Sequence, residues 1–299
     1  MDKRKIIIDT DPGIDDCYAI MLATLYDKFD ILGITITGQL IVKLILAVIV
    51  VIMNYFFSKF IIFKKNKIKL VWTFHDCWAF TGYCPHFTIE NCDKWKSSCY
   101  KCVQKSRYSW FFDKSKMLFE KKKSLLTGLD LTIVTPSEWL AGLVKQSFLK
   151  EHAVCVINNG IDLSVFKPNE SDFRTKYELK NKKIVLGVSF DWGEKKGLDV
   201  FIDLARRLNN DYRVVLVGTN EEIDKTLPKN IISIHRTQNQ KELAEIYTTA
   251  DIFVLPTREE NYPTVNMEAL ACGVPVLTFD TGGSAEIITE SCGCAVAKD

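Results

Sequence analysis

The stretch that most constrains the fold runs from Ala250 to Glu290, where short apolar runs alternate with polar, glycine-containing loops. Ile252–Leu255 has the pattern of a buried strand, and Pro256 ends it. Val274–Phe279 has the same pattern and predicts a second buried strand. Two such strands, separated by a loop and a segment of helix length, are typical of a parallel α/β sheet.

A helix is expected between these two strands. Thr264 is a residue type that caps helices and Gly273 is typical of the position after a helix, so we expect a helix from Thr264 to about Cys272. After the second strand, Thr281-Gly282-Gly283 predicts a turn into a further helix. Ligands of such sheets bind at the carboxyl ends of the strands, so the loops that follow the strands form the candidate site.

Two acidic residues lie in this region, Glu260 in the loop and Glu268 in the expected helix, with seven residues between them. Both carboxylates can face one ligand, since Glu268 lies about one turn into the helix. Carboxylates accept hydrogen bonds from paired sugar hydroxyls, and the backbone N–H groups of Tyr262–Val265 at a helix start suit a phosphate. The alternative is an acidic loop and a capped amphipathic helix without a ligand.

The surrounding sequence, EALACGVPVLTFDTGG after a Glu-x7-Glu spacing, resembles the donor half of GT-B glycosyltransferases of the family 4 type. The resemblance extends over about Lys69–Asp299. It implies transfer of a sugar from a UDP-, GDP- or ADP-sugar, with retention and without a catalytic metal. It would place Glu268 on the nucleotide ribose and Glu260 on the donor sugar. The loop between them would contact the diphosphate and the sugar through Tyr262, Pro263 and Thr264.

Composition sets only loose bounds on the function. A length of 299 residues fits about two domains, and 47% apolar residues are enough for a core. The net charge of +2 gives no reason to expect a nucleic-acid partner. No secretory signal is expected, because Met1–Ile8 runs directly into an acidic motif. Five of the ten cysteines fall between Cys77 and Cys102, and we expect thiols or metal ligands rather than disulfides.

Residues 5–38 have the pattern of a βαβ unit that contains DTDPGIDD and DILGITITG. This segment resembles the amino terminus of the inosine-uridine-preferring nucleoside hydrolases. The resemblance implies a Ca²⁺ site with Asp11 and Asp16 as ligands and Asp15 as the general base, and oxygen ligands suit Ca²⁺. The rest of that family's site comes from later in its chain. Nothing in this sequence supplies it, so we expect no nucleoside hydrolysis.

Leu40–Phe57 is nearly continuous apolar sequence, and extended to Phe63 it is long enough to span a bilayer. The lysines that follow it fit a cytoplasmic flank. Its end, NYFFSKFIIFKK, resembles the last membrane helix of GtrA-type membrane proteins. We therefore expect a membrane partner and a location at the cytoplasmic face of the membrane. The alternative is a buried helix or strand pair in a cytoplasmic protein.

A histidine follows the next apolar strand pattern. Lys69–Phe74 predicts a strand, and His75 comes directly after it in the motif HDCWAFTGYC. In family 4 GT-B enzymes a histidine at the end of such a strand faces the donor sugar, so the resemblance implies this role for His75. The alternative is a structural histidine.

Four cysteines, Cys84, Cys92, Cys99 and Cys102, lie in a stretch rich in Trp, Tyr and Gly. Cys99 and Cys102 form a CxxC pair, and four thiolates suit tetrahedral Zn²⁺. The set predicts one structural zinc, in which Cys77 could replace one ligand. The alternatives are two disulfides or buried thiols.

Two further features follow along the chain. Trp110–Thr127 predicts an amphipathic helix, and its Lys121–Lys123 run predicts a solvated face. The sequence NNGID at Asn158–Asp162 resembles the crossing between the two domains of GT-B enzymes. We expect the domain boundary near residues 160–170.

A loop is expected over Phe190–Gly197, after a buried strand. In the resembled family this loop carries a basic pair that neutralises the diphosphate. The resemblance assigns this role to Lys196. The family's arginine six positions earlier is Phe190 here, so the second charge is either missing or supplied by Lys195. A cation there would stabilise the charge that develops as the sugar leaves. The alternative is a solvated lysine pair.

The sequence therefore predicts a GT-B-like α/β fold with a near-complete carboxyl-terminal Rossmann-like domain and a truncated amino-terminal α/β domain. The expected parts are a nucleoside hydrolase-like fragment (1–38), an apolar segment (39–66), a partial acceptor-side domain (67–165) and a nucleotide-sugar-binding domain (166–299). The expected function is glycosyl transfer to a cell-surface polysaccharide or glycolipid, by family analogy. The alternatives are a nucleoside hydrolase and a non-catalytic fusion product that retains nucleotide binding.

Overall fold

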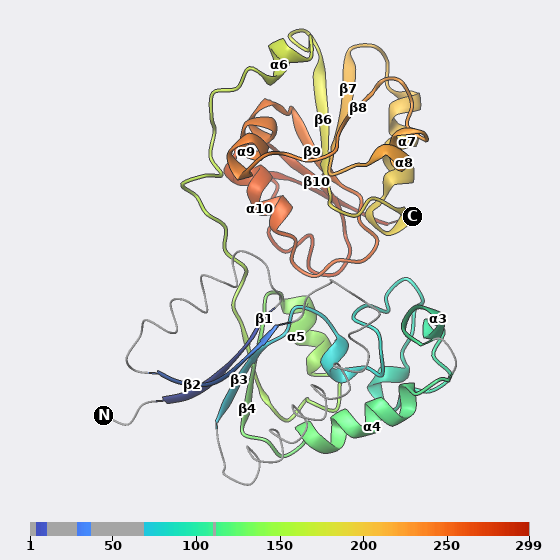
Figure 1. Ribbon diagram of the computed structural model, residues 1–299, viewed down its shortest axis with the longest axis vertical. Coiled ribbons are helices and arrows are strands. Elements are labelled where there is room, and N and C mark those ends of the chain that lie inside the picture. The colour runs from blue at the N-terminus through green and yellow to red at the C-terminus, as the bar shows by residue number, and fades with distance from the viewer. Residues whose placement is uncertain (1–3, 11–28, 37–68, 110–111, 299) are drawn as a thin grey trace. The chain divides into compact units, whose positions relative to one another are not determined.

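The structure is a computed structural model that describes residues 4–10, 29–36, 69–109 and 112–298 (Figure 1). The chain divides into two compact units, Met1–Ile157 and Asn158–Asp299. Each unit contains parallel strands and helices, as the α/β prediction requires. The finer division of the chain at residues 38, 66 and 165 stays a prediction.

The described strands of the first unit form two parallel groups. β1 (Arg4–Thr10) pairs with β2 (Phe29–Ile36). A second sheet has the order β3-β4-β5, built from β3 (Leu70–Thr73), β4 (Leu131–Thr135) and β5 (Ala153–Val156). The predicted acidic site of Asp11, Asp15 and Asp16 lies outside the described residues.

The helical segments of the first unit are short. They are η1 (Trp78–Phe80), η2 (Lys94–Lys96), α3 (Lys105–Tyr108), α4 (Ser115–Leu126) and α5 (Glu138–Val144). Ser137 caps α5, because its Oγ accepts a 3.1 Å hydrogen bond from the N–H of Leu140. Phe80, Trp95 and Phe119 come from η1, η2 and α4 and share one buried core with strand residues of β3 and β4. This core fixes the segment that follows β3, where the predicted His75 lies.

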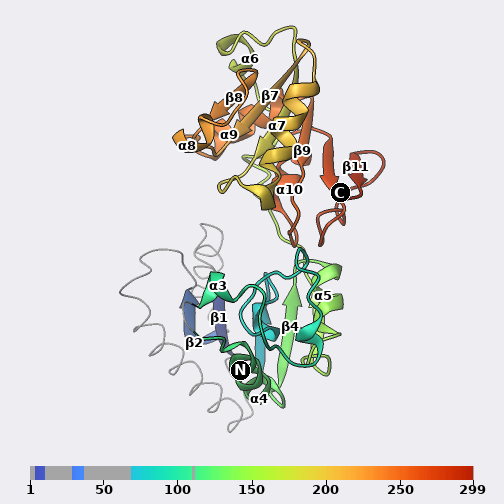
Figure 2. The ribbon, with the colours of Figure 1, turned by 90° about the vertical axis from the view of Figure 1, so that its right-hand side faces the viewer.

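One six-stranded parallel sheet forms the centre of the second unit, in the order β11-β10-β9-β6-β7-β8. Figure 1 labels β6 to β10, and Figure 2 labels β11. Its strands are β6 (Lys183–Val188), β7 (Tyr212–Val217), β8 (Ile231–Ile234), β9 (Ile252–Leu255), β10 (Val276–Phe279) and β11 (Gly293–Val296). The chain runs outward from β6 to β7 and β8, then returns to β9 on the other side of β6. The sheet therefore has a topological switch point between β6 and β9.

Helices cover both faces of this sheet (Figures 1 and 2). The helical segments are α6 (Phe173–Lys176), η3 (Glu194–Lys196), α7 (Leu198–Arg207), α8 (Glu221–Asp224), α9 (Gln240–Thr249) and α10 (Thr264–Ala271). Alternate residues of β6 point to opposite faces. Ile184 and Leu186 share a core with α9 and α10, whereas Val185 packs with Phe201 of α7.

The structure corrects two local predictions around α10. Pro263, with extended backbone, is the residue before the helix, and Thr264 is the first helical residue rather than the cap. Gly273 has a φ of +80°, which confirms the predicted helix stop. The segment after Thr281-Gly282-Gly283 does not form the predicted helix. It forms a series of turns that lead to the edge strand β11.

The structure leaves the membrane prediction without support. In the described ranges, no helix is both long enough and apolar enough to cross a bilayer. The apolar segment 40–63 lies outside those ranges, so the expected membrane helix stays a prediction.

Candidate functional site

The candidate site lies where the loops after three neighbouring strands of the second unit meet. β9 lies between β6 and β10, and the loops after these strands are residues 189–197, 256–263 and 280–283. Because the strands are parallel, all three loops leave the sheet at the same edge. The switch point between β6 and β9 is the place where α/β sheets bind ligands. The predicted Lys196 and Glu260 lie on the two loops that flank it.

Two lysines of the β6 loop pair with two glutamates of the β9 loop. Lys196 Nζ lies 2.6 Å from Glu260 Oε2, and the two side chains are 28% and 21% exposed. Lys195 Nζ pairs with Glu259, whose side chain is only 1% exposed. A buried carboxylate is stable only when a cation or several donors compensate its charge. Both lysines are therefore ion-paired with glutamates of the β9 loop, and their role toward a ligand stays a prediction.

Arg258 of the β9 loop makes further hydrogen bonds to the β6 loop and to the start of α7. Its Nη1 and Nη2 lie 2.8 Å and 2.6 Å from the two carboxylate oxygens of Asp199, which lies at the start of α7. These hydrogen bonds lower the pKa of the Asp199 carboxyl. The backbone N–H of Arg258 also donates to the carbonyl of Lys195 at 2.8 Å. The spacing between the lysines and the glutamates is therefore fixed by several contacts.

The loop after β10 packs against the backbone of the β9 loop. Gly282 has a φ of +59°, and a Cβ placed on it would lie 1.7 Å from the carbonyl oxygen of Glu260. Thr281 Oγ1 donates to the carbonyl of Arg258 at 3.1 Å. Only glycine permits both the left-handed backbone and this close approach. The glycine turn that the sequence predicted thus positions the backbone of Glu260.

Glu268 lies one turn into α10, as predicted, and a buried tyrosine holds it. Its Oε2 accepts a 3.0 Å hydrogen bond from the hydroxyl of Tyr247 in α9. Tyr247 is completely buried. Burial first, and the Glu268 carboxylate second, raise the pKa of Tyr247 well above its ordinary value. The phenol therefore stays protonated and donates to the carboxylate, which fixes the orientation of Glu268.

The start of α10 provides the third predicted element, the stretch from Tyr262 to Thr264. The first N–H groups of a helix have no intrahelical acceptor and carry partial positive charge. Pro263, the residue before the helix, makes no side-chain capping hydrogen bond. The side chain of Asn159 donates to the carbonyl of Tyr262 at 3.1 Å and ties the interdomain sequence NNG to this loop. These features suit a phosphate group at the helix start.

His75 lies in the first unit, at an exposed position two residues after the end of β3. The next residue, Asp76, accepts a 2.7 Å hydrogen bond from the N–H of Trp78. Burial is the largest cause that raises the pKa of Asp76, and the Trp78 N–H and nearby cations oppose it. His75 is thus the residue directly before a turn that the hydrogen bond between Asp76 and Trp78 stabilises.

Lys122 of α4 binds backbone carbonyls of the turn that follows His75. The predicted solvated face Lys121–Lys123 is therefore wrong at its middle residue. Lys122 is only 3% exposed. Its Nζ donates to the carbonyls of Trp78 at 2.6 Å and Thr81 at 3.0 Å and lies 3.6 Å from the centre of the Trp78 ring. Burial lowers the pKa of Lys122 to about 7, although Asp76 opposes this shift.

The four cysteines predicted to bind zinc lie close enough to shift one another's pKa values. Burial, followed by the neighbouring thiols of Cys102 and Cys99, raises the pKa of Cys84 to about 12. No disulfide joins the nine cysteines of the described residues. In the same part of the chain, no three His, Cys, Asp or Glu side chains are arranged to hold one metal ion. The predicted zinc site on Cys84, Cys92, Cys99 and Cys102 is not confirmed.

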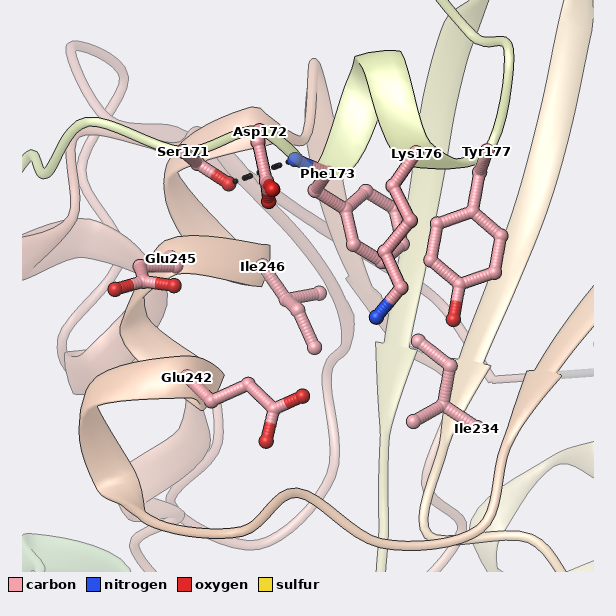
Figure 3. Close-up of a pocket in the computed structure, with 9 residues that line it drawn as sticks. All are labelled: Ser171, Asp172, Phe173, Lys176, Tyr177, Ile234, Glu242, Glu245 and Ile246. Atoms are coloured by element: carbon pink, nitrogen blue, oxygen red, sulfur yellow. Dashed lines mark hydrogen bonds between the residues drawn. The ribbon is translucent and has the colours of Figure 1, made fainter.

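A small cavity lies elsewhere in the second unit, between α6, β8 and α9 (Figure 3). Its volume is about 60 Å³, and Lys176, Tyr177, Glu242 and Ile246 are among its lining residues. Nucleotide-sized ligands need pockets of about 300 Å³ or more. None of the predicted donor residues lines this cavity, so it is not the candidate site.

Sequence reasoning missed three residues of the site, which are Arg258, Glu259 and Tyr247. A carboxylate beside Glu260 and a tyrosine in an amphipathic helix carry no local signal of their own. Tyr247 could have been suspected, because it lies on the apolar face of α9 while its hydroxyl needs a partner when buried. The pairing of Lys195 with Glu259 joins residues 64 positions apart and needs the fold.

Comparison with known proteins gives similarity to glycosyltransferases. Residues 169–297 match the family described as "Glycosyl transferases group 1". An N,N'-diacetylbacillosaminyl-diphospho-undecaprenol alpha-1,3-N-acetylgalactosaminyltransferase of Campylobacter jejuni is 31% identical over 162 residues, which are 50% of this chain and 43% of that protein. Three curated relatives are matched over 58%, 43% and 52% of their lengths, so the chain spans about half of each.

Solved structures extend the likeness to the whole fold. A sucrose-phosphate synthase of Thermosynechococcus elongatus superposes with a TM-score of 0.68 and 16% identity, over 99% of this chain and 86% of that one. HepE of Anabaena, solved in complex with UDP, has a TM-score of 0.65 and 15% identity, over 98% and 85% of the two chains. The predicted fold class is thereby confirmed. The chain has the GT-B fold, and its residues 169–297 are similar to the glycosyl transferases group 1 family.

Proposed function

We propose that this chain is a glycosyltransferase that moves a sugar from a nucleotide-sugar donor to an acceptor. One observation carries the proposal. At the switch point of the second sheet, a cation (Lys196), a carboxylate (Glu260) and the start of α10 come from the loops of two neighbouring strands, and Glu268 follows one turn later. A nucleoside diphosphate sugar presents a ribose, two phosphates and a sugar, and these groups supply carboxylates for the hydroxyls and positive charge for the phosphates.

Each group has a role that its chemistry supports. Glu268 would accept hydrogen bonds from the ribose hydroxyls, with Tyr247 holding its second oxygen. The N–H groups of Tyr262 and Thr264 would bind the diphosphate at the helix start, where Pro263 has no N–H to donate. Lys196 would bind the phosphate next to the sugar, and Glu260 would accept hydrogen bonds from the sugar hydroxyls. Lys195 is held by the buried Glu259, so its role is to support the loop.

Catalysis would break the bond between the anomeric carbon and the phosphate oxygen and form a bond from that carbon to an acceptor hydroxyl. Negative charge then develops on the leaving diphosphate, and Lys196 and the helix start would stabilise it. The proton of the acceptor hydroxyl passes to an oxygen of the leaving diphosphate as the new bond forms. The family resemblance implies retention at the anomeric carbon and a sugar-facing role for His75 of the first unit.

The donor and acceptor are proposed at the level of class. The donor would be a UDP-, GDP- or ADP-sugar, and HepE, of similar fold, was solved with UDP. The name of the Campylobacter relative describes a lipid-linked acceptor. We propose a cell-surface polysaccharide or glycolipid acceptor at the cytoplasmic face of a membrane, which the apolar segment 40–63 would contact. A structural zinc on the four cysteines stays a prediction, and elemental analysis of reduced protein tests it.

The test is donor turnover by the purified full chain. The chain is incubated with UDP-, GDP- and ADP-sugars, and release of nucleoside diphosphate is measured with and without lipid-linked and oligosaccharide acceptors. We expect one donor to be consumed, and Lys196→Met to lower the rate about 100-fold. The matched control Glu194→Gln changes charge on the same loop at an exposed position and should retain activity. Binding without turnover would instead support a non-catalytic fusion product, and ribose release from inosine would support a nucleoside hydrolase.

A further inference from the structure

We propose that the ion pair between Lys196 and Glu260 makes the site discriminate against a nucleoside diphosphate that carries no sugar. The inference rests on the proposed function and concerns the same site. Lys196 Nζ lies 2.6 Å from Glu260 Oε2, across the switch point from the β6 loop to the β9 loop. The two groups that would receive the phosphate and the sugar therefore neutralise each other.

A ligand that takes Lys196 must break this pair. Glu260 Oε1 accepts a 3.2 Å hydrogen bond from the N–H of Asn261, and Oε2 accepts from Lys196. When a phosphate takes the ammonium group, Oε2 loses its charged donor inside a partly buried site. A carboxylate that loses such a partner without a replacement is destabilised.

The sugar decides whether the loss is compensated. In a nucleotide-sugar the hydroxyls of the sugar can donate to Oε2 when Lys196 moves to the phosphate. A nucleoside diphosphate has no sugar hydroxyl beside Glu260. The carboxylate then stays without a donor in place of Lys196, and this cost weakens binding of the nucleoside diphosphate. The pair would therefore favour the sugar-carrying donor over the product that is left after transfer, and it would speed product release.

The neighbouring pairs explain why this exchange involves Lys196 and not Lys195. Lys195 is bound to Glu259, whose side chain is 1% exposed, and removal of its cation would leave a deeply buried carboxylate. Arg258 makes two hydrogen bonds with Asp199. Asp199 is 54% exposed, but its pair with Arg258 holds the two loops together. Glu260, at 21% side-chain exposure, is the partly exposed carboxylate that can change its partner while these two contacts stay in place.

The test measures binding of UDP, GDP and ADP, and of the matching nucleotide-sugar, to the full chain by calorimetry. We expect Glu260→Gln to bind the preferred nucleoside diphosphate about fivefold more tightly than the parent, because Lys196 is then available. The same substitution should weaken binding of the nucleotide-sugar. Glu194→Gln, which removes the same charge from an exposed position nearby, should change both affinities equally.

The Glu260→Gln substitution in a Lys196→Met variant tests whether the tighter binding of the diphosphate depends on Lys196. In Lys196→Met, the additional change Glu260→Gln should no longer tighten binding of the diphosphate. Unchanged or weaker diphosphate binding by Glu260→Gln in the parent would overturn the proposal, and so would an equal gain in the Lys196→Met background. Failure of the proposed function is a different result, in which the parent binds no nucleoside diphosphate at all.

Discussion

Replacement of Lys122 by methionine should remove a pH dependence from the stability of the first unit. Lys122 is 3% exposed, and burial lowers its pKa from the ordinary value of 10.5 to about 7. Between these two values the unfolded chain binds a proton that the folded chain has released. The free energy of unfolding therefore rises with pH in this range and is lowest below pH 7.

The magnitude follows from the two pKa values. From pH 7 to pH 8.5, this one group should add about 1.7 kcal/mol to the free energy of unfolding. The range stops at pH 8.5 because the buried thiols act in the opposite direction above it. The pKa of Cys84 is raised to about 12 and that of Cys99 to about 11, so stability falls once the unfolded thiols ionise.

Urea denaturation followed by tryptophan fluorescence measures this effect, because five of the six tryptophans belong to the first unit. We expect the parent to gain stability from pH 7 to pH 8.5 and Lys122→Met to lack that gain. Lys121→Met, at an exposed position in the same helix, is the control and should behave like the parent. Parallel pH profiles for the parent and Lys122→Met would refute the assignment of a depressed pKa to this residue.

Two further predictions concern the second unit. Gly282→Ala would place a Cβ 1.7 Å from the carbonyl oxygen of Glu260, so it should destabilise the unit by about 2–4 kcal/mol and abolish donor binding. Gly193→Ala has no atom within 4 Å of the new Cβ and should be tolerated in the same thermal-unfolding and calorimetry assays. Tyr247→Phe removes the 3.0 Å hydrogen bond to Glu268 and should weaken nucleotide binding about three- to tenfold. An unchanged affinity would show that Tyr247 does not position Glu268.

The buried strands of the second unit could be predicted from sequence, because each is an apolar run bounded by residues that break strands. The bounds of β9 agree with the predicted range Ile252–Leu255, and β10 lies within the predicted range Val274–Phe279. β11 was missed, since Gly293–Val296 is a short and largely exposed edge strand. An edge strand of this kind has neither a buried face nor an alternating pattern to reveal it.

The candidate site could be predicted in its residue types but not in its pairing. Glu260, Glu268 and Lys196 were expected from spacing and resemblance, and the structure brings Lys196 to Glu260. Which lysine is held by a buried carboxylate depends on the way two loops 64 residues apart pack against each other. The burial of Lys122 was likewise invisible in the run Lys121–Lys123, because only the packing of α4 against the turn after His75 distinguishes its middle residue.

The most direct test of the proposed site is nucleotide binding by the purified full chain, measured by calorimetry against UDP, GDP and ADP. We expect one of the three to bind, and Glu268→Ala to weaken that binding roughly ten- to a hundredfold through loss of a charged hydrogen bond to ribose. Circular dichroism of the same samples would establish that the variant is folded. If none of the three nucleotides binds the parent, or if folded Glu268→Ala binds as tightly as the parent, the second unit does not hold a nucleotide donor in the way proposed.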